Sequence, residues 1–274
     1  MAVTFLVVPQ WQGSGSSRAM RLVDGANAIL ADLPHSSTQV VSVPSHAGDD
    51  RGTGVARLSS LQTVVENQTQ LLNNITGTVI TVGGDCGVEL ASVAHVAAAH
   101  DVALLWFDAH ADSHTPQTSP SSAFHGMVLR TLIGDGEPSL VPSTPLDPSR
   151  VFLVGTRAVD EDEAVYLDGA GPRVLSPADL TAKSLLSAIT DSGATSVYIH
   201  VDLDVLDPAE FDGIGYPEPF GISAAELLDL IRAVTAQFPL VGAGVTEFAP
   251  ASDEHTLSDM PTILRIIGAL AKAG

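Results

Sequence analysis

Seven short runs of almost purely apolar residues, rich in β-branched side chains, are spaced along the chain and constrain its fold more than any other feature. These runs lie at 3–8, 39–43, 78–82, 102–107, 151–155, 197–201 and 240–245. Because apolar and polar residues do not alternate within them, they are typical of strands that are covered on both faces. Amphipathic stretches lie between and after them, at 18–31, 55–72, 88–100, 176–190, 224–237 and 256–273. This alternation predicts an α/β fold with a parallel sheet flanked by helices.

The length of 274 residues fits one large α/β domain better than two small ones. The chain contains no internal repeat and no linker long enough to divide it. We therefore expect a single catalytic domain over residues 1–274. The segments 114–122 and 138–149 are rich in proline and serine, which predicts surface loops.

The formal net charge is -20, from 32 acidic and 12 basic residues. Such a surface repels phosphate backbones and anionic lipids, so we expect neither nucleic acid nor membrane as a partner. The single cysteine excludes an intramolecular disulfide. The apolar N-terminal run has no basic residue before it and no cleavage site after it, and it is interpreted as a strand instead of a signal peptide. No apolar stretch reaches the roughly 18–20 residues that span a bilayer. These features predict a soluble, cytoplasmic enzyme.

Polar residues follow four of the predicted strands. In open parallel sheets, ligands bind beyond the carboxyl ends of the strands. The polar segments are GGDC at 83–86, DAHAD at 108–112, HVDLD at 200–204 and TE at 246–247. Four strand ends would thus bring acidic or metal-binding side chains to one edge of the sheet.

Asp108, His110 and Asp112 are spaced so that an extended backbone would turn all three toward the same side. Asp202 and Asp204 repeat this spacing after another strand. Buried ionisable groups are costly without partners, and a divalent cation removes that cost. Two such cations roughly 3.5–4 Å apart would share a hydroxide that is a nucleophile at neutral pH. The alternatives are a helix-capping Asp beside an incidental His, and a solvated turn.

Together these motifs resemble the ureohydrolases, the family of arginase, agmatinase and formimidoylglutamase. GGDC at 83–86 resembles the family's GGDH-type motif, and DAHAD at 108–112, DLDVLDP at 202–208 and TEFAP at 246–250 follow in the family's order. The resemblance implies a three-layer α/β/α sandwich with a mostly parallel sheet. It also implies a Mn²⁺ pair whose bridging hydroxide attacks a guanidinium or related carbon, and a homo-oligomer, either trimer or hexamer.

The resemblance also implies the role of each metal ligand. Asp108 and Asp202 would bridge both metals. His110 and Asp204 would complete the coordination of one metal, and Asp112 would bind the other.

Further residues match family positions that contact the substrate. Glu247 would hold the cationic guanidinium, and His125 would shuttle protons near the leaving amine; the alternatives are an ordinary strand-end acid and a structural histidine. The stretch from His114 through Ser121 to His125 resembles arginase more than agmatinase. His114 stands where arginase has an Asn that contacts the substrate carboxylate. Asp160 matches an acid that binds the α-amino group, although a solvated helix start also explains the acidic run 160–163.

Cys86 stands where the family has a metal-binding His. It could act as a thiolate ligand, which would favour Zn²⁺ or Fe²⁺ over Mn²⁺. Alternatively, the metal position could be weakened or empty, the metal could be displaced with an extra water, or the thiol could be inert. The leading hypothesis is an arginase-like amidinohydrolase that cleaves a C–N bond of a guanidino compound. The alternatives are agmatinase or formimidoylglutamase-type activity on another amidine, and a metal-impaired family member without catalysis.

Overall fold

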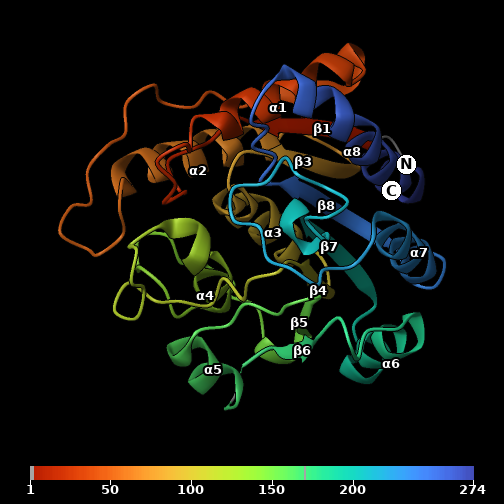
Figure 1. The fold of residues 1–274 in the computed structure, drawn as a ribbon. Coiled ribbons are helices and arrows are strands. Elements are labelled where there is room, and N and C mark those ends of the chain that lie inside the picture. The colour runs from red at the N-terminus through yellow and green to blue at the C-terminus, as the bar shows by residue number, and fades with distance from the viewer. Residues whose placement is uncertain (1–2, 170) are drawn as a thin grey trace.

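A computed structural model describes residues 3–169 and 171–274. Its eight strands form one sheet in the order β2-β1-β3-β8-β7-β4-β5-β6, and each neighbouring pair is parallel (Figure 1). The strands are β1 (Val3–Val8), β2 (Thr38–Val40), β3 (Thr78–Gly83), β4 (Val102–Phe107), β5 (Val151–Val154), β6 (Arg173–Leu175), β7 (Ser196–Asp202) and β8 (Leu240–Thr246). The predicted parallel sheet is confirmed.

Helices cover both faces of this sheet, giving three layers (Figure 1). One face carries α1 (Arg21–Asp32), α6 (Ala182–Ser192), α7 (Ala224–Thr235) and α8 (Asp253–Ala273), and the other carries α2 (Leu58–Leu72), α3 (Glu89–Ala97) and α4 (Val128–Ile133). The helix α5 (Glu161–Leu167) follows β5. Short 3-10 turns complete the chain: η1 (His35–Ser37), η2 (Cys86–Val88), η3 (Phe124–Met127), η4 (Pro148–Arg150) and η5 (Leu203–Val205).

Alternate residues of the central strands enter different hydrophobic cores. Leu105 and Ile199 pack in the core beneath α1, α6, α7 and α8. Trp106 and Tyr198, one position along each strand, pack in the core beneath α3 and α4. Because side chains alternate along a strand, Asp108 at the end of β4, and His200 and Asp202 at the end of β7, lie on the same side of the sheet as Trp106 and Tyr198, which is the α3 side.

The sequence predicted the long elements and missed several short ones, although the short strands β2 and β5 overlap the predicted runs 39–43 and 151–155. The strand β6 and the helices α4 and α5 were not predicted, because elements of three to seven residues carry too little periodicity. The helix predicted at 176–190 begins only at Ala182, where Thr181 forms a capping box with Ser184. The helix predicted at 256–273 begins earlier, at Asp253, because the Ser252 side chain accepts a hydrogen bond from His255 N.

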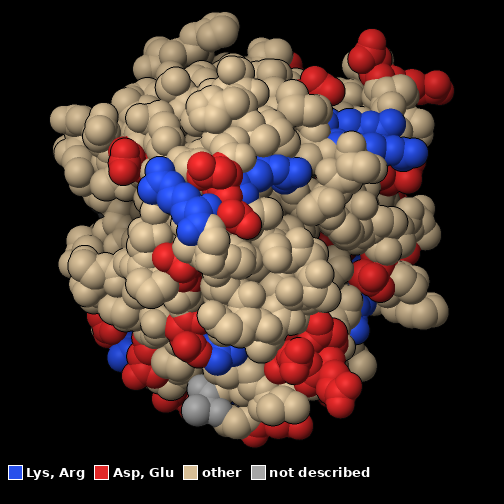
Figure 2. Space-filling view, turned by 90° about the vertical axis from the view of Figure 1, so that its left-hand side faces the viewer, with Lys and Arg blue, Asp and Glu red and all other residues tan. Residues whose placement is uncertain are grey.

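The charges of the chain lie mainly on its surface. Figure 2 shows one face on which acidic side chains are scattered among uncharged ones, with basic side chains in a few places. Within residues 3–169 and 171–274, the helices lack the combination of length and hydrophobicity that crossing a membrane requires.

The glycine pair at the end of β3, Gly83 and Gly84, brings two backbones into contact. Gly84 N donates a hydrogen bond to Val8 O (3.0 Å), and Asp85 N donates one to Gln10 O (3.1 Å). A Cβ at position 84 would overlap the carbonyl oxygen of Gln10, and neither backbone can move without breaking these bonds. The second glycine of the motif is therefore required by packing between β1 and β3.

Gly84→Ala is expected to lower the free energy of unfolding by about 3 kcal/mol, the upper part of the usual cost of overpacking. Urea denaturation followed by circular dichroism would measure it. Gly268→Ala in α8 is the matched control, since nothing lies within 4 Å of a Cβ built there. That control should gain roughly 0.5–1 kcal/mol, because alanine in a helix restricts the unfolded chain. Equal stability of the two variants would contradict the assigned contact.

Candidate active site

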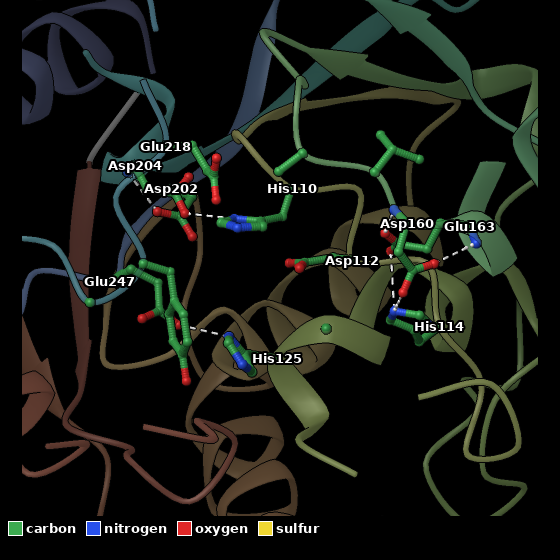
Figure 3. Close-up of a pocket in the computed structure, with 15 residues that line it drawn as sticks. His110, Asp112, His114, His125, Asp160, Glu163, Asp202, Asp204, Glu218 and Glu247 are labelled. Atoms are coloured by element: carbon green, nitrogen blue, oxygen red, sulfur yellow. Dashed lines mark hydrogen bonds and ion pairs between the residues drawn. The ribbon is translucent and has the colours of Figure 1, made fainter. Parts of the chain in front are cut away.

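A cavity of about 440 Å³ opens at the carboxyl ends of the strands. Its wall combines segments that are distant in sequence: the ends of β4, β7 and β8, the turn η3, the start of α5 and the loop before α7 (Figure 3). The ionisable residues that line it are His110, Asp112, His114, His125, Asp160, Glu163, Asp202, Asp204, Tyr216, Glu218 and Glu247. Eight of the eleven residues predicted for the site line this cavity, and Asp108, Cys86 and Ser121 do not.

His110 and Asp204 form one half of the centre of the site. His110 Nδ1 lies 2.8 Å from Asp204 Oδ2 and 3.6 Å from Asp108 Oδ1. The backbone N–H of Ala109 donates to Asp204 Oδ1 (3.0 Å), and Trp106 Nε1 donates to Asp108 Oδ2 (3.0 Å). These bonds fix the orientation of both carboxylates. The ligand atoms of Asp108, His110 and Asp204 lie within 4.8 Å of one another, as a shared metal requires.

Arg157 holds the loop that carries Asp204. Its Nη2 donates to the backbone oxygens of Asp204 (2.9 Å) and Glu218 (2.7 Å), and its Nε donates to Pro219 O (2.9 Å). A guanidinium offers five donors in a fixed plane, which suits several carbonyl oxygens at once. Arg157 thereby ties the turn after β7 to the loop before α7, and keeps one wall of the cavity in place.

Asp112 reaches the cavity by a different route from the one predicted. The strand β4 ends at Phe107, and Asp112 has a left-handed backbone with φ of 49°. An extended backbone over 108–112 is therefore wrong, and a loop brings Asp112 toward the other ligands. Its Oδ2 is buried and accepts no hydrogen bond from the described residues. A buried carboxylate oxygen without a hydrogen-bond partner is typical of a group that binds a cation.

Cys86 occupies the opposite half of the centre. Its thiol donates to Asp202 Oδ2 (3.1 Å), and its backbone N–H donates to Glu247 Oε1 (3.2 Å). The turn η2 that carries it is capped by Asp85, which accepts hydrogen bonds from Gly87 N and Gly13 N (both 2.9 Å). Asp85 in the GGDC motif thus shapes the loop.

The electric field of the site favours a bound cation. Burial raises the pKa of Asp202 well above its usual value, and the nearby charges of Asp204 and Asp108 raise it further. Burial and the charge of Asp108 do the same to Asp112. Burial opposes charging of His110, but Asp108 and Asp204 outweigh it and raise the pKa of the ring. Several carboxylates forced together in a buried space fit divalent metal ions, which would neutralise them.

Glu247 and His125 face each other at one end of the cavity (Figure 3). His125 Nδ1 lies 3.5 Å from Glu247 Oε1, and the ring of Tyr216 lies 5.1 Å from the His125 ring. Burial lowers the pKa of His125, but Glu247 and Asp85 outweigh it and raise that pKa overall. Glu247 has φ of 65°, and its N–H donates to Gly84 O (2.8 Å), so its carboxylate is held by a strained turn.

His114, Asp160 and Glu163 form a second polar group at the other end of the cavity (Figure 3). His114 Nε2 lies 2.9 Å from Asp160 Oδ2 and 3.9 Å from Glu163 Oε1. Asp160 also begins α5, where it forms a capping box with Glu163. Asp160 therefore both caps the helix and lines the cavity, and its binding of an α-amino group stays a prediction. Ser121 is exposed and does not line the cavity; its hydroxyl accepts a hydrogen bond from Ala123 N (3.2 Å).

Some residues of the cavity were not predicted. Glu163 lies in the acidic run 160–163, and its position three residues after the cap Asp160 was the signal that could have found it. Tyr216 and Glu218 lie in a loop without a motif, so only the folded chain brings them to the cavity. His200, in the segment HVDLD at 200–204, is buried and does not line the cavity, and the sequence predicts no role for it.

The sequence model of the arginase family matches residues 15–267. The chain is 31% identical over 264 residues to N(omega)-hydroxy-L-arginine amidinohydrolase of Streptomyces lavendulae, covering 93% of both chains. Its structure resembles arginase of Entamoeba histolytica (TM-score 0.86, 23% identity, 98% and 97% of the two chains). It also resembles formimidoylglutamase of Bacillus subtilis (TM-score 0.79, 17% identity, 99% and 86%). These findings confirm the predicted fold and the prediction of a ureohydrolase-type hydrolase. The chain belongs to the arginase family.

Proposed function

We propose that the protein hydrolyses a C–N bond of the guanidino or N-hydroxyguanidino group of a small amino acid, with a pair of divalent metal ions. The observation that carries this proposal is the layout of one cavity. Metal-binding carboxylates lie at its centre, the Glu247–His125 pair lies at one end, and the His114–Asp160–Glu163 group lies at the other. A volume of about 440 Å³ suits a small substrate. We propose further that residues 1–274 act as one catalytic unit.

The residues at the centre of the cavity would bind the two metal ions. Asp108, His110 and Asp204 offer one set of ligand atoms, and Cys86 and Asp202, which lie in one group with Glu247, offer a second. Mn²⁺ is the proposed metal from the family resemblance, with Zn²⁺ or Fe²⁺ favoured at the thiolate. When bound, these ions supply a nucleophile by lowering the pKa of water into the neutral range.

The Glu247–His125 end would receive the guanidino group. A carboxylate accepts two parallel N–H bonds from a guanidinium, which fixes the plane of the group and neutralises its charge. Glu247 lies close to His125 and raises its pKa, which favours the protonated form, and a protonated ring can donate a proton to the leaving amine. This end would therefore set both the orientation of the scissile bond and the fate of the proton.

The opposite end would receive the amino-acid head group. Asp160 and Glu163 offer acceptors for an α-ammonium, and His114 can donate to a carboxylate. The amidinohydrolase of Streptomyces lavendulae is named for N(omega)-hydroxy-L-arginine, and this molecule has the required head group and a modified guanidine. L-arginine and its N(omega)-hydroxy derivative are therefore the two leading substrates.

A release assay over a panel of substrates tests the proposal. Purified protein, stripped with EDTA and reloaded with Mn²⁺, Zn²⁺ or Fe²⁺, would be given L-arginine, N(omega)-hydroxy-L-arginine, agmatine and N-formimidoyl-glutamate. Urea or hydroxyurea release from the first two is expected, with loss of turnover in EDTA and recovery with metal. Preference for agmatine or the formimidoyl compound would favour the alternative activities. Absence of both metal binding and turnover would identify a non-catalytic family member.

Asp160→Asn is expected to raise KM for the preferred amino-acid substrate by about tenfold, since a half-exposed charged hydrogen bond to the α-ammonium is lost. Asn is as good a helix cap as Asp, so α5 should keep its start. KM for 5-guanidinopentanoate, which lacks the amino group, should stay unchanged. Asp162→Asn removes an exposed charge on the same turn and serves as the control. Equal effects on both substrates would show that Asp160 does not contact the amino group.

A further inference from the structure

Three buried residues, Cys86, His200 and Glu89, lie behind the cavity on the α3 side of the sheet. Of these, only Cys86 has a part in the function proposed above. Cys86 is 1% exposed, and His200 and Glu89 are 0% exposed. His200 lies on β7 two residues before Asp202, on the same face of the strand, and Glu89 is the first residue of α3. Buried ionisable groups of this kind are costly unless a partner compensates them.

His200 is aimed at the thiol. Its Nε2 lies 3.8 Å from Cys86 Sγ, and the ligand atoms of Cys86, His200 and Asp108 lie within 4.8 Å of one another. The ring stacks on Trp106 with centroids 3.6 Å apart and an interplanar angle of 21°, which fixes its plane. An imidazole nitrogen, a sulfur and a carboxylate oxygen thus converge on one point from β7, η2 and β4.

Glu89 stands behind the other nitrogen of the ring. Its Oε2 lies 3.8 Å from His200 Nδ1. Neither that nitrogen nor either oxygen of Glu89 has a hydrogen-bond partner among the residues that the structure describes. Gly244 on β8 makes room for this carboxylate, because a Cβ there would overlap Glu89 Oε1. The strand therefore keeps a glycine where Glu89 approaches His200.

We propose that His200 is a metal ligand, which binds through Nε2 the same ion as Cys86, while Glu89 holds its Nδ1–H. Metal-binding histidines commonly donate their second N–H to a carboxylate, which fixes the tautomer and the ring. Sulfur, imidazole and carboxylate together form a donor set that suits Zn²⁺. The imidazole that the family motif places at position 86 is thereby supplied from β7 in this chain.

A nucleophilic role for Cys86 fits the surroundings less well. A reactive thiolate needs nearby positive charge, and the thiol instead lies 3.1 Å from Asp202 Oδ2 with further carboxylates around it. The sulfur also does not line the cavity in which a substrate would bind. A bound cation would allow the thiol to lose its proton and would pair the carboxylates at the same time.

The inference rests on the metal dependence proposed above, and X-ray absorption of the wild-type protein loaded with two Zn²⁺ tests it directly. We expect one sulfur and two imidazoles in total for the two ions, from Cys86, His110 and His200, which is an average of about half a sulfur and one imidazole per Zn²⁺. One imidazole in total, an average of about one half per Zn²⁺, would overturn the assignment of His200 without affecting the proposed function. Failure of the wild-type protein to retain any divalent metal would instead overturn the proposed function.

Replacing His200 gives a second readout. His200→Gln should weaken Zn²⁺ binding by about 100-fold in chelator competition, and Glu89→Gln by roughly 10-fold, since loss of a carboxylate behind a ligand costs 10–100-fold. His100→Gln, an exposed histidine after α3, is the control and should bind Zn²⁺ like the wild type. Unchanged affinity in His200→Gln would mean that the His200–Glu89 pair serves only packing. If His200→Gln does not fold, the Zn²⁺ affinity of Glu89→Gln and the X-ray absorption spectrum of the wild type still show whether His200 binds the metal.

Discussion

Asp202→Asn is expected to lower kcat/KM by at least about 10³-fold, because it removes a charged ligand at the centre of the proposed metal pair. Asp202 Oδ2 accepts from the Cys86 thiol (3.1 Å), and Oδ1 accepts from Asp204 N (2.8 Å). Asparagine keeps the size of the side chain and can keep the second bond. The decrease in kcat/KM would therefore result from the lost charge of Asp202 and not from a change in packing. Turnover of the preferred substrate and metal content of the same sample would measure it.

The same substitution should stabilise the metal-free protein. The pKa of Asp202 is raised in the folded state by burial and by Asp204 and Asp108. Stability that depends on such a group is present below its unfolded pKa and is lost as pH rises through the folded pKa. At neutral pH in EDTA, a neutral side chain avoids this loss, so the melting temperature of Asp202→Asn should exceed that of the wild type. Opposite changes in activity and apo stability are typical of a site built for function.

Asp229→Asn provides the matched control, since its side chain is 77% exposed and pairs with Arg232 on the surface of α7. It should leave activity and metal content unchanged. Near-normal turnover of Asp202→Asn with a full metal complement would rule out Asp202 as an essential ligand.

The sequence alone predicted the sheet because its inner strands are long, apolar and regular. β3, β8, β7 and β4 lie side by side in the middle of the sheet, and each was visible as an apolar run. β6 was missed because it is three residues long and only Val174 and Leu175 are apolar. β2, at the opposite edge, is equally short but overlaps the longer run 39–43.

The site was predictable where strand ends determine it and unpredictable where loops do. Asp108, Asp202 and Asp204 lie within two residues of a strand end. The alternation of side chains along a strand and the common carboxyl edge of a parallel sheet therefore predict that they meet at the site. The sequence motifs also placed Asp112 and Glu247 at the site, but they did not predict the positive φ with which the backbone turns each of these side chains toward the cavity. His114 meets Asp160 only because the loop after β4 and the start of α5 lie side by side.

The sequence did not predict the interactions of His200, because they also depend on how distant segments pack together. A histidine inside an apolar strand is usually structural. Its spacing of two residues before Asp202 was a signal that both face the same side. What gives it a role is contact with Cys86 and Glu89, and those contacts depend on how η2 and α3 lie against β7. Tertiary packing, and not local pattern, decides between the two interpretations.

Glu247→Gln is expected to lower kcat/KM for the guanidino substrate by about 10³-fold, since loss of one charge from a buried ion pair costs roughly 4 kcal/mol. Glutamine retains the shape of the side chain and one acceptor oxygen, but it presents an N–H to the cationic group. Glu218→Gln, which changes another carboxylate of the cavity wall, is the matched control and should lose less than about 10-fold, as expected when no substrate pair is broken. Steady-state kinetics of both variants would measure the difference.

The pH dependence of the residual activity separates this role from simple binding. The pKa of His125 is raised because Glu247 and Asp85 outweigh the opposing effect of burial. Replacing Glu247 by Gln should lower that pKa, with only Asp85 left to raise it. If protonated His125 delivers a proton to the leaving amine, activity falls as pH rises through its pKa. The alkaline limb of kcat should therefore move to lower pH in Glu247→Gln and stay in place in Glu218→Gln. An unchanged alkaline limb, with the His125 ring shown by NMR to titrate at a lower pH, would remove His125 from the proton pathway.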